Sequence, residues 1–324
     1  MTGSASRFAP LGRHLALTLL WFGVFRLLGE HAVRLLPRSV TQELTLQSYL
    51  TGVQILTAII GLGLAFLFLG DAREALGIAL PRPSAVGVLA LLAPAFYVLA
   101  SYAAIYAALP TLLEELRQGG RQAVQQSTGE FGRELTQASL LSALLWGVVV
   151  SPVGEELMFR GALWSLVDRG IRLLRAPPRA PRPESLALPA GVITDGLGLR
   201  AARGLGQLLL TGGIATLVSA GIFAWMHADM PGGLGIVRWV SALGLGLCAG
   251  IARHASRGIV GPCAVHMGFN LCSLATTRRW LVTEDFPMKR GVPTLLSATG
   301  AALCLAALGL WLAARRGRSG RGAG

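Results

Sequence analysis

The chain has 324 residues, of which 53% are hydrophobic and only 14% are charged. This composition excludes an ordinary soluble domain, which needs far more charge on its surface, and it indicates a protein that folds in lipid. The net charge of +13 comes almost wholly from arginines that lie between apolar runs, so the lipid bilayer, and not nucleic acid, is the expected partner of the basic residues.

Apolar runs along the chain predict an all-α membrane protein, a polytopic bundle of about eight transmembrane helices. Each run is long enough to cross a hydrocarbon core of about 30 Å. The predicted spans cover residues 14–29, 46–70, 84–109, 138–166, 207–228, 234–252, 258–276 and 293–314. The first is expected to remain in the protein as a helix, because no small-residue cleavage site follows it.

An even number of spans places both termini on one side of the membrane. The loops on that side carry the larger share of arginine and lysine. By the positive-inside rule, we expect both termini in the cytoplasm and a multi-pass protein of the inner (plasma) membrane.

Three regions follow from this pattern. Residues 1–137 form an N-terminal three-helix region that ends in an amphipathic connector, 138–276 form a core, and 277–324 form the last span and a basic tail. Within the core, residues 168–206 are rich in proline and arginine and predict a cytoplasmic loop. Polar residues near predicted span ends, including His14 and His254, are expected to reach the headgroup interface.

The fourth span breaks the rule that charges avoid the membrane interior. Glu155, Glu156 and Arg160 lie within one apolar run, and an ionisable group in hydrocarbon costs several kcal/mol, which makes it a functional hypothesis by default. Glu156 and Arg160 are four residues apart, so they share a helix face and can form an ion pair. Glu155 is rotated by about 100° from that face and is left available for chemistry.

Two later spans carry the other polar exceptions. His227 follows Phe223 by one helical turn, and His266 and Asn270 are likewise one turn apart. A glutamate and a histidine can deprotonate a water molecule, while a histidine and an amide can donate hydrogen bonds to an oxyanion. These are the parts of a peptide hydrolase, although a lone histidine or a single Glu–Arg pair in a helix bundle is more often structural.

These motifs resemble those of the CPBP family, which joins bacterial Abi proteins to the type II CAAX prenyl endopeptidases. Glu155-Glu156-x-x-x-Arg160 is similar to its EExxxR motif, Phe223-x-x-x-His227 to FxxxH, and His266-x-x-x-Asn270 to HxxxN. The resemblance covers about residues 138–276 and implies an intramembrane endopeptidase of the glutamic type. The first three spans and the last match only in general character.

The resemblance also implies roles for individual residues. Glu155 and His227 would activate the water, His266 and Asn270 would hold the oxyanion, and Glu156 and Arg160 would orient the site. A zinc ion held by Glu155, His227 and His266 is the less favoured alternative, because no HExxH spacing is present and asparagine is a poor zinc ligand. We therefore expect no cofactor and no metal.

The expected substrate is a membrane-anchored protein or peptide. The long loop between the first and second motifs departs from close relatives and argues against assuming a prenylated CAAX tail. Two other functions remain open at this point: a non-proteolytic membrane scaffold or chaperone of the same fold, and a proton-coupled transporter. The transporter is least expected, because the sequence has no inverted repeat. The oligomeric state is left open.

Overall fold

The computed structural model describes residues 3–35, 46–78, 83–118, 139–175, 197–228 and 231–278. All regular structure in these ranges is helical, which confirms the all-α membrane fold. The helices outside the fourth predicted span are α1 (Gly3–Leu35), α3 (Leu46–Phe68), α4 (Ala72–Ala75), α5 (Pro83–Arg117), α10 (Leu197–Met226), α11 (Gly232–Ser256) and α12 (Val260–Thr277).

The number of spans differs from the prediction of eight. Within the described residues, four helices are long and apolar enough to cross a membrane: Phe8–Gly29, Leu89–Glu115, Leu140–Arg175 and Gly232–Ser256. The apolar parts of α3 and α10 are shorter, at Gly52–Phe68 and Gly212–Met226. Helix α12 has 18 residues, but His266, Asn270 and its C-terminal threonines lower its hydropathy. The eighth predicted span, 293–314, lies outside the described residues.

The fourth predicted span is one long helix at the centre of the bundle. It runs from Leu140 to Arg175 through α7 (Leu140–Ala143), η1 (Leu144–Val150), α8 (Ser151–Glu156), η2 (Leu157–Leu163) and α9 (Trp164–Arg175). Ser139 begins it as an N-cap, since its hydroxyl accepts from the amide of Ser142 at 3.1 Å. The elements η1 and η2 are π-helical, and such turns occur frequently at functional sites.

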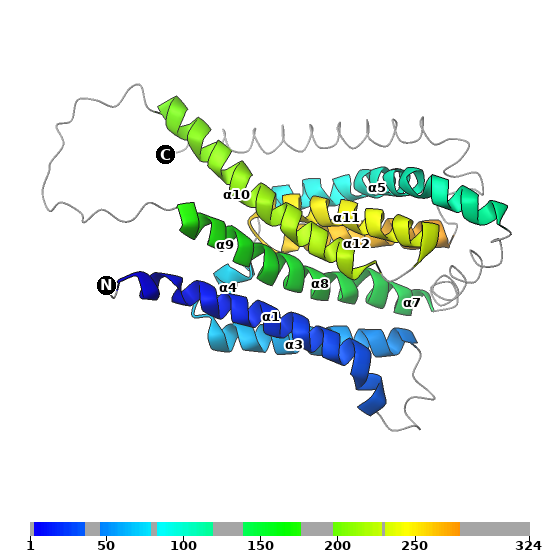
Figure 1. Ribbon diagram of the computed structural model, residues 1–324, viewed down its shortest axis with the longest axis horizontal. Coiled ribbons are helices and arrows are strands. Elements are labelled where there is room, and N and C mark those ends of the chain that lie inside the picture. Colours follow the sequence, from blue (N-terminus) through cyan, green and yellow to red (C-terminus); the bar gives the residue numbers. More distant parts are fainter. Residues whose placement is uncertain are drawn as a thin grey trace, which may run out of the picture.

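The other helices pack around this central helix on two sides. Figure 1 shows α1 and α3 together on one side of it, and α5, α11 and α12 grouped on the other. Helix α10 runs obliquely in front of α11 and α12 and packs against α9 and α11. Residues in the middle of the central helix therefore meet side chains from several helices that are distant in sequence.

The predicted loop at 168–206 was too long. The helix continues to Arg175 and the next begins at Leu197, and residues 176–196 lie outside the described part of the chain. The charged residues in the last turns of this helix are paired: Arg172 Nε donates to Asp168 Oδ2 at 2.8 Å, and Arg169 Nη2 donates to Asp71 Oδ2 at 2.8 Å. Pairing allows the helix to carry them.

The amphipathic connector predicted after the third span begins as helix. Helix α5 continues to Arg117, while residues 119–138 lie outside the described ranges. Glu115, near the end of α5, accepts a hydrogen bond from the amide of Gly233 at 2.9 Å. This carboxylate satisfies an amide in the first turn of α11 and fixes the two helix ends to each other.

The prediction that His14 reaches the headgroup interface was wrong. His14 is fully buried, because α1 begins at Gly3, well before the predicted span, and packs against η2 and α9. His254 is half-buried and lies near the Trp164 ring.

Candidate active site

Glu156 and Arg160 form the buried ion pair that their spacing predicts. The distance from Arg160 Nη1 to Glu156 Oε1 is 3.1 Å, and both side chains are 0% exposed. Arg160 Nη2 also donates to the carbonyl of Gly246 at 2.9 Å. A side chain at position 246 would press on Ala220 and on the guanidinium, so the glycine lets α10 and α11 approach closely enough for this bond.

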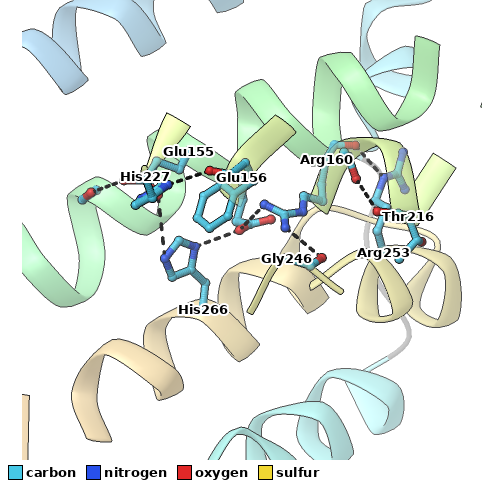
Figure 2. A network of polar contacts seen from close by, with 11 residues as sticks. Glu155, Glu156, Arg160, Thr216, His227, Gly246, Arg253 and His266 are labelled. Carbon is cyan, nitrogen blue, oxygen red and sulfur yellow. Dashed lines mark hydrogen bonds and ion pairs between the residues drawn. The ribbon is translucent and has the colours of Figure 1, made fainter. Parts of the chain in front are cut away.

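His266 joins the two glutamates from the opposite side. Its Nδ1 lies 2.8 Å from Glu156 Oε1, and its Nε2 lies 3.8 Å from Glu155 Oε2. Figure 2 shows His266 reaching from α12 toward the central helix, with Glu156 and Arg160 along the same row of contacts. The imidazole is buried, so α12 completes the cluster that the central helix begins.

Glu155 points to a different neighbour from Glu156, as the helical spacing predicts. Its Oε1 accepts a hydrogen bond from Ser151 Oγ at 2.6 Å. Its side chain is 14% exposed, whereas that of Glu156 is 0% exposed. Of the two carboxylates, Glu155 is therefore the one that a small molecule such as water can reach.

Phe223 links the second motif to the first and third. Its ring centroid lies 4.4 Å from that of His227 and 5.8 Å from that of His266, and Arg160 Cζ lies 4.8 Å from it. His227 therefore lies at the level of the cluster, although its hydrogen bond runs from Nδ1 to the Phe223 carbonyl at 2.7 Å.

In both histidines the hydrogen bond uses Nδ1, which leaves Nε2 for other contacts. A backbone carbonyl can only accept, so Nδ1 of His227 must carry the proton in that bond. An ionised Glu156 imposes the same arrangement on His266. Each ring therefore presents Nε2 toward its surroundings, as an acceptor when the ring is neutral and as a donor when the ring is protonated.

Asn270 lies on the same helix as His266 but does not contact the carboxylates. Its Nδ2 donates to the carbonyl of Gly147 in η1 at 2.7 Å. In the i→i+5 register of a π-helix the Gly147 carbonyl would pair with Pro152, which has no N–H, so the Asn270 amide supplies the donor. The second hydrogen on Nδ2 remains available for another acceptor.

Further residues that hold this cluster in place were not predicted from the sequence. Ser151 precedes Glu155 by four residues, the same separation that identified Arg160, so the signal was present in the sequence. Gly246 and Arg253 gave no comparable signal. Arg253 is buried on α11, and its Nε donates to the Arg160 carbonyl at 3.2 Å. Within the part of the chain that the structure describes, no group of three His, Cys, Asp or Glu side chains could hold a metal ion.

The fold and the site together define a class: a helical membrane protein with a cluster of carboxylates, a guanidinium and an imidazole buried within its helices. Residues 136–272 match the family model described as type II CAAX prenyl endopeptidase Rce1-like. Over this segment the chain is similar to that family of CAAX-type proteases. The segment contains all six predicted site residues. No curated protein and no solved structure matched the chain.

Proposed function

We propose that this protein is an intramembrane endopeptidase that hydrolyses a peptide bond of a membrane-anchored protein or peptide. The observation that carries the proposal is the 3.8 Å separation between Glu155 Oε2 and His266 Nε2 beside a fully buried Glu156–Arg160 pair. This distance is too long for a direct hydrogen bond and suits a bridging water. The family match supports the same class of reaction.

In the proposed reaction, Glu155 takes a proton from the water while the water oxygen attacks the carbonyl carbon of the peptide bond. The negative charge moves to the carbonyl oxygen, where His266 Nε2 and the second Nδ2 hydrogen of Asn270 donate to it. Glu155 then returns its proton to the amide nitrogen as the C–N bond breaks. The products are a carboxylic acid and an amine, and no covalent intermediate with the enzyme forms.

His227 and His266 both act through Nε2 in this scheme, His227 as a hydrogen-bond acceptor and His266 as a donor. His227, held by a neutral carbonyl, offers the lone pair of Nε2 to the water beside Glu155. His266, held by the Glu156 carboxylate, donates from Nε2 in its protonated form. Glu156 and Arg160 orient His266 and do not themselves touch the substrate. The scheme uses no metal ion and no cofactor.

The location of the protein belongs to the same proposal. We place it in the inner (plasma) membrane with both termini in the cytoplasm, on the distribution of arginine and lysine between loops. The substrate would then be a membrane-anchored chain whose peptide bond reaches the level of Glu155.

The decisive experiment compares peptide termini in the membrane proteome of cells that make wild-type protein or the Glu155→Gln variant. We expect a small set of termini to disappear in the variant, because the amide of glutamine cannot accept the proton of water. Glu114→Gln is the matched control, since Glu114 is exposed on α5. Both variants must reach the membrane in wild-type amounts.

The outcome separates the alternative functions. Unchanged termini in the Glu155→Gln variant would contradict the protease. Binding of a membrane protein that survives in the same variant would then favour a scaffold or chaperone. A proton flux in liposomes that depends on Glu155 would favour a transporter.

A further inference from the structure

Ser151 makes the closest polar contact to the proposed base. Its hydroxyl lies one helical turn before Glu155 and donates to Oε1 at 2.6 Å. A hydroxyl has one hydrogen to donate, so this bond uses all of it. A distance this short is typical of an O–H donor bound to an ionised carboxylate.

The direction of this hydrogen bond is unusual for a helical serine. Serine inside a helix commonly donates back to the carbonyl four residues earlier, which for Ser151 is the carbonyl of Gly147. That carbonyl accepts instead from Asn270 Nδ2 at 2.7 Å. The serine hydroxyl donates forward to the carboxylate, and the Gly147 carbonyl has its donor from α12.

The forward bond determines which oxygen of Glu155 faces His266. With Oε1 held by Ser151, Oε2 is the oxygen that lies 3.8 Å from His266 Nε2. The other charged groups around Glu155 are Glu156, which follows it in the chain, and Arg160, whose charge acts on it through space. A carboxylate without the serine could rotate toward the imidazole and close the gap that the water needs.

We propose that Ser151 is a positioning residue for the reaction: it holds one oxygen of Glu155 so that the other faces the water between Glu155 and His266. This role rests on the proposed endopeptidase function. Ser151 does not contact the substrate.

The test compares three variants by the rate at which Glu155-dependent termini appear in membrane vesicles. Ser151→Ala removes the donor, Ser151→Cys keeps nearly the same volume with a weak donor, and Ser151→Thr keeps the hydroxyl. Because general base catalysis contributes about 10²–10⁴-fold, we expect the alanine and cysteine variants to be slower by about tenfold or more. The threonine variant should keep most of the wild-type rate. Ser142→Ala, on the same central helix, is the control.

A second measurement reports the hydrogen bond without relying on cleavage. The infrared difference between wild-type protein and Glu155→Gln isolates the carboxylate band of Glu155. We expect that band to shift in the alanine variant and to return in the threonine variant. Thermal unfolding in detergent identifies a variant that does not fold. If one of the three Ser151 variants fails to fold, the comparison between the other two tests the role of Ser151.

Each negative result has one meaning. A wild-type rate in Ser151→Ala, an equal loss in Ser151→Thr, or an unshifted infrared band overturns the role of Ser151. If Glu155→Gln leaves every terminus unchanged, the proposed function itself fails, whatever the infrared band shows. The two failures are therefore distinguishable.

Discussion

Removing Arg160 tests the central electrostatic feature of the fold. In the Arg160→Met variant, Glu156 keeps its hydrogen bond to His266 but loses its ion-pair partner at 3.1 Å, and the Gly246 carbonyl loses a donor. Both side chains of the pair are 0% exposed, so water cannot compensate for the loss. Methionine approximates the length of the arginine arm, which limits the packing change.

The size of the effect follows from burial. Breaking a buried ion pair by removing one partner costs about 3–5 kcal/mol. Leaving a buried carbonyl without a donor adds about 1–3 kcal/mol. His266 still contacts Glu156 and offsets part of this cost, so we expect the free energy of unfolding to fall by about 3–5 kcal/mol in total.

The measurement is reversible unfolding in mixed detergent micelles, with Arg172→Met as the matched control. Arg172 forms the same i,i+4 pair on the same helix, with Asp168, but its side chain is 53% exposed. Because the carboxylate of Asp168 is only 11% exposed, the loss of Arg172 should cost about 1–3 kcal/mol, less than the loss of Arg160. The double variant Glu156→Gln/Arg160→Met should recover stability relative to Arg160→Met alone. The reasoning would be refuted if Arg160→Met lost no more stability than Arg172→Met.

Three further predictions concern other contacts. Gly61→Leu should lower the free energy of unfolding by about 1–3 kcal/mol, because a side chain there collides with the buried ring of Trp21; Gly63→Leu, which has open space, should be tolerated. Asn270→Ala should cost about 1 kcal/mol through the lost bond to Gly147 and should also slow cleavage, whereas unchanged stability would contradict that contact. Asp71, whose pKa is lowered by the hydrogen bond from Arg169, should contribute less than about 1 kcal/mol, since its side chain is half exposed. A lowered pKa means that this contribution is present above the ordinary pKa of aspartate and is lost as the pH falls through the lowered value. The stability difference between wild type and Asp71→Asn, followed against pH, should therefore shrink in acid; a growing difference would contradict the ion pair.

Contacts within one helix were the most predictable part of the site. The four-residue spacing of Glu156 and Arg160 predicted their ion pair, because residues one turn apart share a face in any α-helix. The bond from Ser151 to Glu155 has the same spacing and went unrecognised, since only opposite charges had been considered. A spacing rule that includes hydroxyl donors would have found it.

Helix ends were less predictable, because they depend on contacts that the local sequence does not show. The fourth span was ended too early, because the segment that follows is rich in proline and arginine. In the fold, Arg169 meets Asp71 from a distant part of the chain, and the helix continues to Arg175. Packing of α1 against η2 and α9 likewise buries His14, which the sequence had placed at the interface.

The sequence by itself determined that the chain is an all-α membrane protein, that carboxylates and an arginine lie inside it, and that Glu155 and Glu156 point in different directions. These features follow from hydropathy and the 3.6-residue period, which act within one segment. Only the tertiary structure decided that His266 meets Glu156, that Arg160 reaches the Gly246 carbonyl and that Asn270 binds Gly147. Those contacts depend on the rotation and depth of separate helices, and packing between helices sets both.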